Sequence, residues 1–295
     1  MTQDRLTVLS QLPAALAKPL EEIVINPKFS ATLTEQQVAH LMDATGFDAV
    51  ILAQHLLPLA ALYAETPVSD FHVGAIARGR SGALYFGANI EFSGVSLGQT
   101  IHAEQAAIAH AWMCGENELS DIIVDTPPCG HCRQFMNELA NVEALQITLP
   151  NQATKKLHDY LPAAFGPADL GMKIRLMDQQ THQLQADYSD PLQQAALKAL
   201  NHSYAPYSHS LSGVAIELKD QHICLGAYAE NAAFNPSLPP LQVAVILLKM
   251  GGYSWHDINR VVLAETKNAT VTHLDTTRSV LQKITPHIQL EHIEI

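Results

Sequence analysis

The chain has 295 residues, of which 47% are hydrophobic and 16% are charged, a balance typical of a folded protein rather than a disordered one. Its 17 Lys and Arg residues are outnumbered by 29 Asp and Glu residues, which gives a formal net charge of -12. Such a chain lacks the broad basic surface that neutralises phosphates, so we expect no nucleic-acid partner. The length suits two domains of ordinary size.

No segment of the sequence has the pattern of a membrane span. The apolar segment at residues 49–64 is interrupted by Gln54, His55 and Pro58, and it is shorter than the roughly 18 to 20 apolar residues that cross a bilayer. The first residues place Asp4 and Arg5 between short apolar pieces, without the basic start, apolar run and cleavage site of a secretory signal. These patterns predict a cytoplasmic protein without a membrane segment.

In chain order, the sequence predicts four segments. Residues 1–48 are expected to form a small helical domain, with a helix start at Thr34. Residues 49–150 combine short apolar strands with an apolar helix from His102 to Met113. Residues 151–190, which contain several Pro, Gly and polar residues, are interpreted as a connector. Residues 191–295 again show a helix, at residues 241–250, followed by a β-branched run.

The second and fourth segments resemble each other. Residues 67–70 (Pro-Val-Ser-Asp) match residues 206–209 (Pro-Tyr-Ser-His), and residues 87–91 match residues 226–230, at an offset of 139 residues in both cases. Two copies of one unit are therefore expected, which we call the first copy (residues 49–150) and the second copy (residues 191–295). Helices that alternate with short apolar strands predict a layered α/β fold in each copy, with the two copies packed as pseudo-symmetric partners.

Metal-binding chemistry is concentrated in His102-Ala103-Glu104 and in Pro128-Cys129-Gly130-His131-Cys132. The chain has only four Cys residues, and a close pair in a long cytosolic protein is more often a metal or redox site than a disulfide framework. One imidazole and two thiolates suit zinc, and three protein ligands leave the fourth tetrahedral position open for water. The motifs therefore predict one catalytic Zn²⁺ per chain, bound by His102, Cys129 and Cys132.

Glu104 follows the His ligand by two residues. At a helix start, both side chains can point toward a pocket beyond the end of the helix, although they do not share a helical face. His-x-Glu followed by Pro-Cys-x-x-Cys is the signature of zinc deaminases, in which the Glu acts as general acid and base. The reaction is inferred from this signature rather than from spacing alone, and Glu104 is the predicted catalytic residue.

These motifs, together with residues 71–75, 86–91 and 234–236, resemble the cytidine deaminases, specifically the long homodimeric bacterial form, over essentially the whole chain. The resemblance implies two pseudo-repeated α/β/α domains with mixed sheets, a small N-terminal helical domain and a homodimer. It also implies pyrimidine salvage, by hydrolytic deamination of free cytidine and deoxycytidine to uridine and deoxyuridine with release of ammonia.

The resemblance also assigns roles in substrate binding. Asn89 and Glu91 match the family's pair that holds the ribose hydroxyl, and residues two apart on a strand face the same side. Phe71 matches the aromatic residue that packs on the pyrimidine. Ala103 matches the residue whose backbone N–H contacts the base.

The second copy lacks the chemical groups of the first. Its counterpart of residues 102–104 is interpreted as Pro240-Leu241-Gln242, and no Cys pair follows Leu263, so it is expected to be catalytically silent. We expect it to serve packing and dimer formation. The resemblance implies that Ala232 and Phe234, with Phe165 of the connector, help to close the pocket of the partner subunit.

Two other functions share parts of this pattern. A deaminase that edits cytosine or adenine in nucleic acid would need a basic track and stacking aromatic residues, and the acidic composition disfavours it. A non-catalytic, zinc-stabilised binding protein would need a closed site with four ligands, and a lone Cys-x-x-Cys can also be a redox pair. His131 is not expected to bind the metal, because adjacent helical positions point apart. Zinc analysis and ammonia release from cytidine distinguish these functions.

Overall fold

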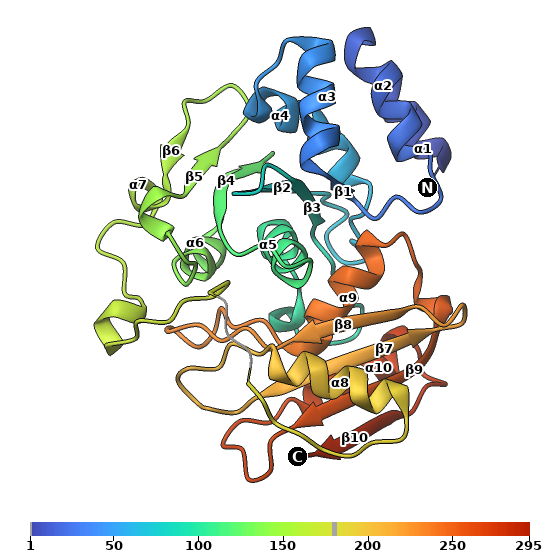
Figure 1. Cartoon of the computed structure of the whole chain (residues 1–295), viewed down its shortest axis with the longest axis vertical. Coiled ribbons are helices and arrows are strands. Elements are labelled where there is room, and N and C mark those ends of the chain that lie inside the picture. The colour runs from blue at the N-terminus through green and yellow to red at the C-terminus, as the bar shows by residue number, and fades with distance from the viewer. Residues whose placement is uncertain (1, 179–181) are drawn as a thin grey trace.

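The chain folds around two β-sheets, one built mainly from each copy, in a computed structural model that describes residues 2–178 and 182–295 (Figure 1). The helices formed by the N-terminal residues lie on the outer side of the first sheet, and the second sheet lies at the opposite end of the molecule (Figure 1). Both sheets mix parallel and antiparallel strands, which confirms the predicted α/β class with mixed sheets.

The N-terminal residues are helical, as predicted. The helices that precede the first copy are α1 (Thr2–Leu9), α2 (Ala14–Val24) and α3 (Glu35–Thr45). Helix α3 begins with a capping box, in which Gln37 N donates to the Thr34 hydroxyl and Thr34 N donates to the Gln37 side chain, so the predicted helix start is confirmed. Buried leucines of α2 share one core with the first sheet. The boundaries at residues 48, 150 and 190 remain predictions.

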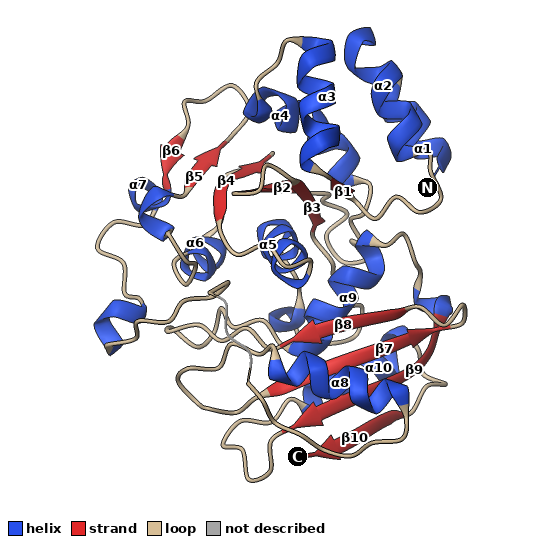
Figure 2. Cartoon of the chain, in the orientation of Figure 1, coloured by secondary structure: helices blue, strands red, loops and turns tan. Residues whose placement is uncertain are grey.

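The first sheet has six strands in the order β1-β3-β2-β4-β5-β6. Only β4 and β5 pair in parallel. Helix α4 (Ala49–Ala61) covers one face, and α5 (Ala103–Met113) covers the other (Figure 2). The strands are β1 (Thr32–Leu33), β2 (Gly74–Gly79), β3 (Leu84–Ala88), β4 (Leu119–Val124), β5 (Gln146–Thr148) and β6 (Lys155–Lys156).

Shorter elements complete the first half. Helix α6 (Gly130–Met136) follows β4, and α7 (Leu157–Tyr160) lies in the predicted connector. Residues 179–181 of that connector lie outside the described residues. The 3-10 turns among the described residues are η1 (Leu97–Gln99), η2 (Val142–Ala144), η3 (Pro167–Leu170) and, in the second copy, η4 (Trp255–Asp257).

The second sheet has four strands in the order β10-β9-β7-β8. Strands β9 and β10 pair in parallel, and the other pairs are antiparallel. Helix α8 lies in front of this sheet in the view of Figure 2, and α10 lies behind it. The elements are α8 (Pro191–Asn201), β7 (Ser212–Leu218), β8 (Ile223–Ala227), α9 (Pro240–Met250), β9 (Ile258–Glu265), α10 (Leu274–Ile284) and β10 (Leu290–Glu294).

Strand register confirms the repeat and corrects one detail of it. Gly74 pairs with Ala88 in the first copy, as Gly213 pairs with Ala227 in the second, at the predicted offset of 139. The following segments differ in length, because an isolated bridge joins residues 90 and 101 in the first copy but residues 229 and 238 in the second.

The second copy is thus two residues shorter between its hairpin and its apolar helix. The interpretation of Pro240-Leu241-Gln242 as the counterpart of His102-Ala103-Glu104 is therefore wrong by one residue. The structural counterpart is Pro239-Pro240-Leu241, which also lacks a metal ligand and a carboxylate.

Glycine allows each apolar helix to approach its sheet closely. A Cβ atom on Gly87 would lie 2.1 Å from the backbone nitrogen of Ala107 in α5. In the second copy, a Cβ atom on Gly226 would lie 2.3 Å from the nitrogen of Ala244 in α9. These contacts fix the position of α5, whose first turn carries the predicted catalytic residue.

No single helix among the described residues is long and apolar enough to cross a membrane. Helices α3 and α4 satisfy the length and composition requirement only as a pair, with a bend of 103° between them.

Candidate metal centre and active site

The starts of two helices meet at one point in the first copy. His102 is the N-cap of α5, Cys129 is the N-cap of α6, and Cys132 lies in the first turn of α6. The His102 Nδ1 atom lies 3.4 Å from the Cys129 sulfur and 3.2 Å from the Cys132 sulfur, and the two sulfurs are 3.5 Å apart. The structure therefore brings together the three predicted ligands.

This donor set fits zinc. Tetrahedral zinc, with bonds of about 2.3 Å to sulfur and about 2.1 Å to nitrogen, would hold its ligand atoms about 3.6 to 3.8 Å apart, close to the observed spacing. Within the described residues, this is the only group of three or more His, Cys, Asp or Glu side chains whose ligand atoms all lie within 4.8 Å of one another. His131 stacks on His102, with 5.4 Å between ring centroids, and does not belong to the group.

The pKa values of the three ligand side chains are shifted in different directions. Hydrogen bonding to Cys132, supported by His102, lowers the pKa of the Cys129 thiol to about 3, so this sulfur is a thiolate at neutral pH. The hydrogen bond with Cys129 raises the pKa of His102. Hydrogen bonding to Cys129 and burial raise the pKa of Cys132. A bound divalent cation would favour the thiolate at both sulfurs, because metals bind the deprotonated form.

Glu104 faces the same point from the first turn of α5. Its side chain is buried (5% exposed), and the Cys132 thiol donates to its Oε2 atom over 3.2 Å. Burial raises the pKa of Glu104 above its ordinary value. A carboxyl group with a raised pKa beside a metal-binding set is suited to accept and return a proton.

A cavity of about 410 Å³ opens onto these groups, within the roughly 300 to 1,000 Å³ range of small-molecule pockets. Phe71 lies at the cavity with 56% of its surface exposed, and Ala103 lines it from the first position of α5. The lining residues are Ser69, Phe71, Val73, Asn89, Glu91, Thr100, His102, Ala103, Glu104, Thr126, Pro127 and Cys129.

Asn89 shapes the wall of this cavity. Its side-chain amide donates to the Phe71 carbonyl over 2.8 Å, and its Oδ1 atom accepts from Val73 N over 2.9 Å. The backbone beneath Phe71 is thereby held in place. An amide has two N–H groups and two oxygen lone pairs, so Asn89 keeps one donor and one acceptor for a ligand.

Glu91 holds the adjoining turn. Its Oε2 atom accepts from Val68 N and Ser69 N, and the Ser69 hydroxyl donates to Oε1. Burial alone would raise the pKa of Glu91, but the hydrogen bonds from Ser69 and Val68 outweigh it and lower the pKa. The side chain is therefore an anionic hydrogen-bond acceptor in the cavity wall.

One local expectation differs from the structure. Strand β3 ends at Ala88, so Asn89 and Glu91 lie just beyond a strand rather than on it. Ile90, between them, makes isolated bridges to Glu65 and Ile101. Both flanking residues nevertheless line the same cavity, so the expectation that they face the same side is met without a strand.

Three polar residues that line the cavity were not predicted: Ser69, Thr100 and Thr126. Ser69 lies inside the repeated segment at residues 67–70, which was a usable signal. Thr100 and Thr126 reach the cavity because the chain returns to the sheet edge twice, and no local pattern marks them.

The chain has close relatives of known type. Two family models described as "Cytidine and deoxycytidylate deaminase zinc-binding region" match residues 52–148 and 157–278. Cytidine deaminase of Vibrio vulnificus (strain CMCP6) is 50% identical to this chain over 287 residues, which cover 97% of both chains. The chain belongs to the cytidine deaminase family. Cytidine deaminase of Cronobacter sakazakii is 53% identical over 94% of both chains.

A solved structure of cytidine deaminase from Mycobacterium tuberculosis is 34% identical and covers 39% of this chain and 96% of that one, with a TM-score of 0.36. Membership of the cytidine deaminase family confirms the resemblance predicted from the motifs. The protein is a zinc-dependent hydrolase that deaminates cytidine, and zinc is its cofactor.

Proposed function

We propose that the deaminase reaction takes place in the 410 Å³ cavity, with zinc held by His102, Cys129 and Cys132 and with Glu104 as the catalytic residue. The observation that carries this proposal is the convergence of the three ligand atoms and the buried Glu104 carboxylate at the cavity. When bound there, zinc supplies Lewis-acid activation of a water molecule.

Glu104 handles the protons of the reaction. It takes a proton from the attacking water as the new C4–O bond forms, and it delivers a proton to N3 of the ring. It then helps to protonate the amino group, the C4–N bond breaks and ammonia leaves. One cytidine and one water thus give one uridine and one ammonia.

The cavity wall binds the nucleoside. Phe71 packs on the pyrimidine, the backbone N–H of Ala103 contacts the base, and the remaining donor and acceptors of Asn89 and Glu91 hold a ribose hydroxyl. No Lys or Arg is among the lining residues of this cavity, so a 5′-phosphate has no cation to meet it there. We therefore propose free cytidine and deoxycytidine as the substrates, in pyrimidine salvage.

Steady-state rates on cytidine, deoxycytidine, cytidine monophosphate and free cytosine test this choice of substrate. Both nucleosides should release ammonia, whereas the monophosphate and the free base should be poor substrates. Equal turnover of the nucleoside and the monophosphate would contradict the proposed fit.

We also propose that the protein is a cytoplasmic homodimer. None of the four cysteines, all of which lie in the described residues, forms a disulfide, which suits a reducing compartment. Phe165 and Phe234 are 49% and 65% exposed, as expected of apolar residues that would cover a partner's pocket. Light scattering should give a molar mass about twice the 32.1 kDa of the chain, and a monomeric mass in the fully active enzyme would exclude the dimer.

A further inference from the structure

Glu138 is a completely buried carboxyl group just beyond the end of α6. The hydrogen-bond partners of its side chain all come from the second copy, and Arg175 of the connector adds a favourable charge interaction. The hydroxyl groups of Tyr204 and Tyr207 donate to its Oε1 atom over 2.7 Å and 2.5 Å, and Ala232 N donates to Oε2 over 3.0 Å. Three donors of one copy thus surround one carboxylate of the other.

A buried charge is retained only where hydrogen bonds replace its hydration. Burial raises the pKa of Glu138, and it also raises the pKa of Tyr204 and Tyr207, so both phenols remain protonated donors. Neither tyrosine has another carboxylate as a hydrogen-bond partner in the described structure. The group is a specific contact between the copies rather than an incidental one.

The same part of the second copy contacts both helices that carry the proposed zinc ligands. The Asn231 side chain donates to the Gln134 carbonyl inside α6 over 3.0 Å. In α5, the Gln105 side chain donates to the Pro236 carbonyl and accepts from His102 N. The loop at residues 231–236 is thus bonded to the backbone or side chains of α5 and α6.

The contact between Tyr207 and Glu138 depends on Glu230, which is the second copy's counterpart of the cavity residue Glu91. Glu230 stands where the first copy has Glu91, and its Oε2 atom accepts from Tyr207 N and Ser208 N, as Glu91 accepts from Val68 N and Ser69 N. Glu230 is more deeply buried than Glu91, with 2% exposed against 9%. It fixes the turn from which Tyr207 reaches Glu138.

We propose that Glu138 is a positioning residue for the zinc site. The second copy, whose described residues include no cluster of three metal-binding side chains, holds α6 in place through this carboxylate, and thereby fixes Cys129 and Cys132 relative to His102. The inference rests on the ligand set of the proposed function. It gives the silent copy a role in the metal site of its own chain.

Two substitutions in the full-length zinc enzyme test the proposal. Glu138→Gln keeps the shape but removes the charge, and Tyr207→Phe removes one donor. The rate of zinc transfer to a chromophoric chelator should rise by about tenfold or more in Glu138→Gln, in line with the effect of outer partners on metal affinity, and less in Tyr207→Phe. In the cobalt-substituted enzyme, the visible bands that report thiolate coordination should shift.

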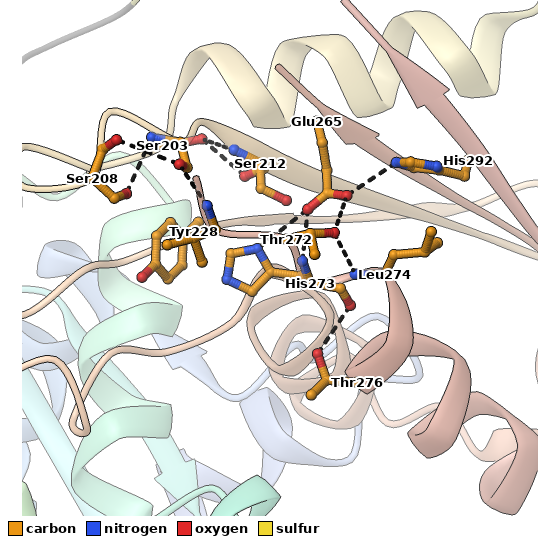
Figure 3. A network of polar contacts seen from close by, with 12 residues as sticks. Ser203, Ser208, Ser212, Tyr228, Glu265, Thr272, His273, Leu274, Thr276 and His292 are labelled. Atoms are coloured by element: carbon orange, nitrogen blue, oxygen red, sulfur yellow. Dashed lines mark hydrogen bonds and ion pairs between the residues drawn. The ribbon is translucent and has the colours of Figure 1, made fainter. Parts of the chain in front are cut away.

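Glu265 provides a matched control. It is also a buried carboxylate (4% exposed), but its side-chain partners are Thr272, His273 and His292, all in the second copy (Figure 3). Glu265→Gln should lower the unfolding temperature while leaving zinc transfer and the cobalt spectrum at the parent values. This control separates loss of positioning from loss of stability in general.

The outcomes are distinct. Faster zinc transfer in Glu138→Gln, and to a smaller degree in Tyr207→Phe, together with parent-like transfer in Glu265→Gln, supports the proposal. Equal acceleration in Glu138→Gln and Glu265→Gln, or parent-like zinc transfer and cobalt spectra in both Glu138→Gln and Tyr207→Phe, would overturn it. If Glu138→Gln does not fold, Tyr207→Phe alone against Glu265→Gln decides between the same outcomes. Failure of the underlying ligand set would show differently, as full zinc retention in Cys129→Ala.

Discussion

The Oε2 atom of Glu104 lies 3.2 Å from the sulfur of Cys132, so the proposed proton carrier and a proposed metal ligand face the same point from two different helices. Helix α5 approaches β3 closely at Gly87, whereas α6 follows β4 and is bonded to the second copy through Gln134 and Glu138. The first sheet and the second copy therefore both contribute to the geometry of the site, and the chemistry of each residue can be tested separately.

Removal of either cysteine ligand should abolish zinc binding and activity together. Cys129→Ala or Cys132→Ala leaves two protein ligands, which hold zinc poorly against water and chelators. Metal analysis after gel filtration should show well under one zinc per chain, and ammonia release should fall to background. A variant with one zinc per chain and full turnover would show that the ligands are misassigned.

Substitution of Asn89 or Glu91 should weaken nucleoside use and leave zinc in place. Loss of a hydrogen bond to a charged group costs about 1.5 to 3 kcal/mol, so kcat/KM for cytidine should fall roughly 10- to 150-fold in Glu91→Ala. Asn89→Ala should lose more than a ribose contact, because it also frees the backbone beneath Phe71.

Free cytosine is the control substrate for this pair. Glu91 is proposed to contact the sugar, and it also holds the turn before Phe71, so Glu91→Ala should lower the rate on cytidine much more than the slow deamination of cytosine. An equal loss on cytosine and cytidine would place Glu91 against the base or the metal instead.

His110 should make stability depend on pH. It is 2% exposed, with Nδ1 2.9 Å from the Phe86 carbonyl and Nε2 3.2 Å from the Thr32 hydroxyl, and burial lowers its pKa from 6.5 to about 4. As pH falls, the unfolded chain takes up this proton near pH 6.5, but the folded protein does so only near pH 4. The free energy of unfolding should therefore fall between these values, by up to about 3 kcal/mol from this residue.

Denaturant unfolding of the parent and of His110→Gln, at pH 7 and at pH 5, measures this contribution. The parent should lose about 2 kcal/mol more than the variant over this interval, because only the parent carries the titrating group. Both proteins contain the same zinc ligands, so acid effects on the metal site cancel in the difference. Equal losses would show that His110 is not held neutral by burial.

The features that could be predicted from the sequence are the local metal motif and the internal repeat. The metal motif was found because helix starts impose a fixed spacing on their ligands, and the repeat was found because both hairpins keep the same register. The counterpart of the metal motif was misplaced by one residue because the segment after β8 is two residues shorter than its counterpart, and no sequence pattern marks where those two residues are missing.

Other features depend on tertiary structure. Strand β1 has only two residues, too few for any periodicity, and exists because Thr32 and Leu33 pair with β3. Thr100 and Thr126 line the cavity only because two loops converge there. The contact of Glu138 with Tyr207 joins residues 69 positions apart, and the sequence near Glu138 gives no sign that its partners lie in the other copy.

Glu104→Gln is the most direct test of the proposed mechanism. The substitution keeps size and hydrogen bonding but removes the group that carries protons between water, N3 and the amino nitrogen. Zinc content and cytidine binding should remain at the parent level, because the three ligands and the cavity wall are unchanged. General acid–base catalysis contributes on the order of a hundred- to ten-thousandfold, and several transfers depend on this residue, so kcat should fall by at least about ten-thousandfold. A zinc-loaded Glu104→Gln enzyme that deaminates cytidine within about tenfold of the parent rate would contradict the mechanism, and Glu104 would then be only a structural neighbour of His102.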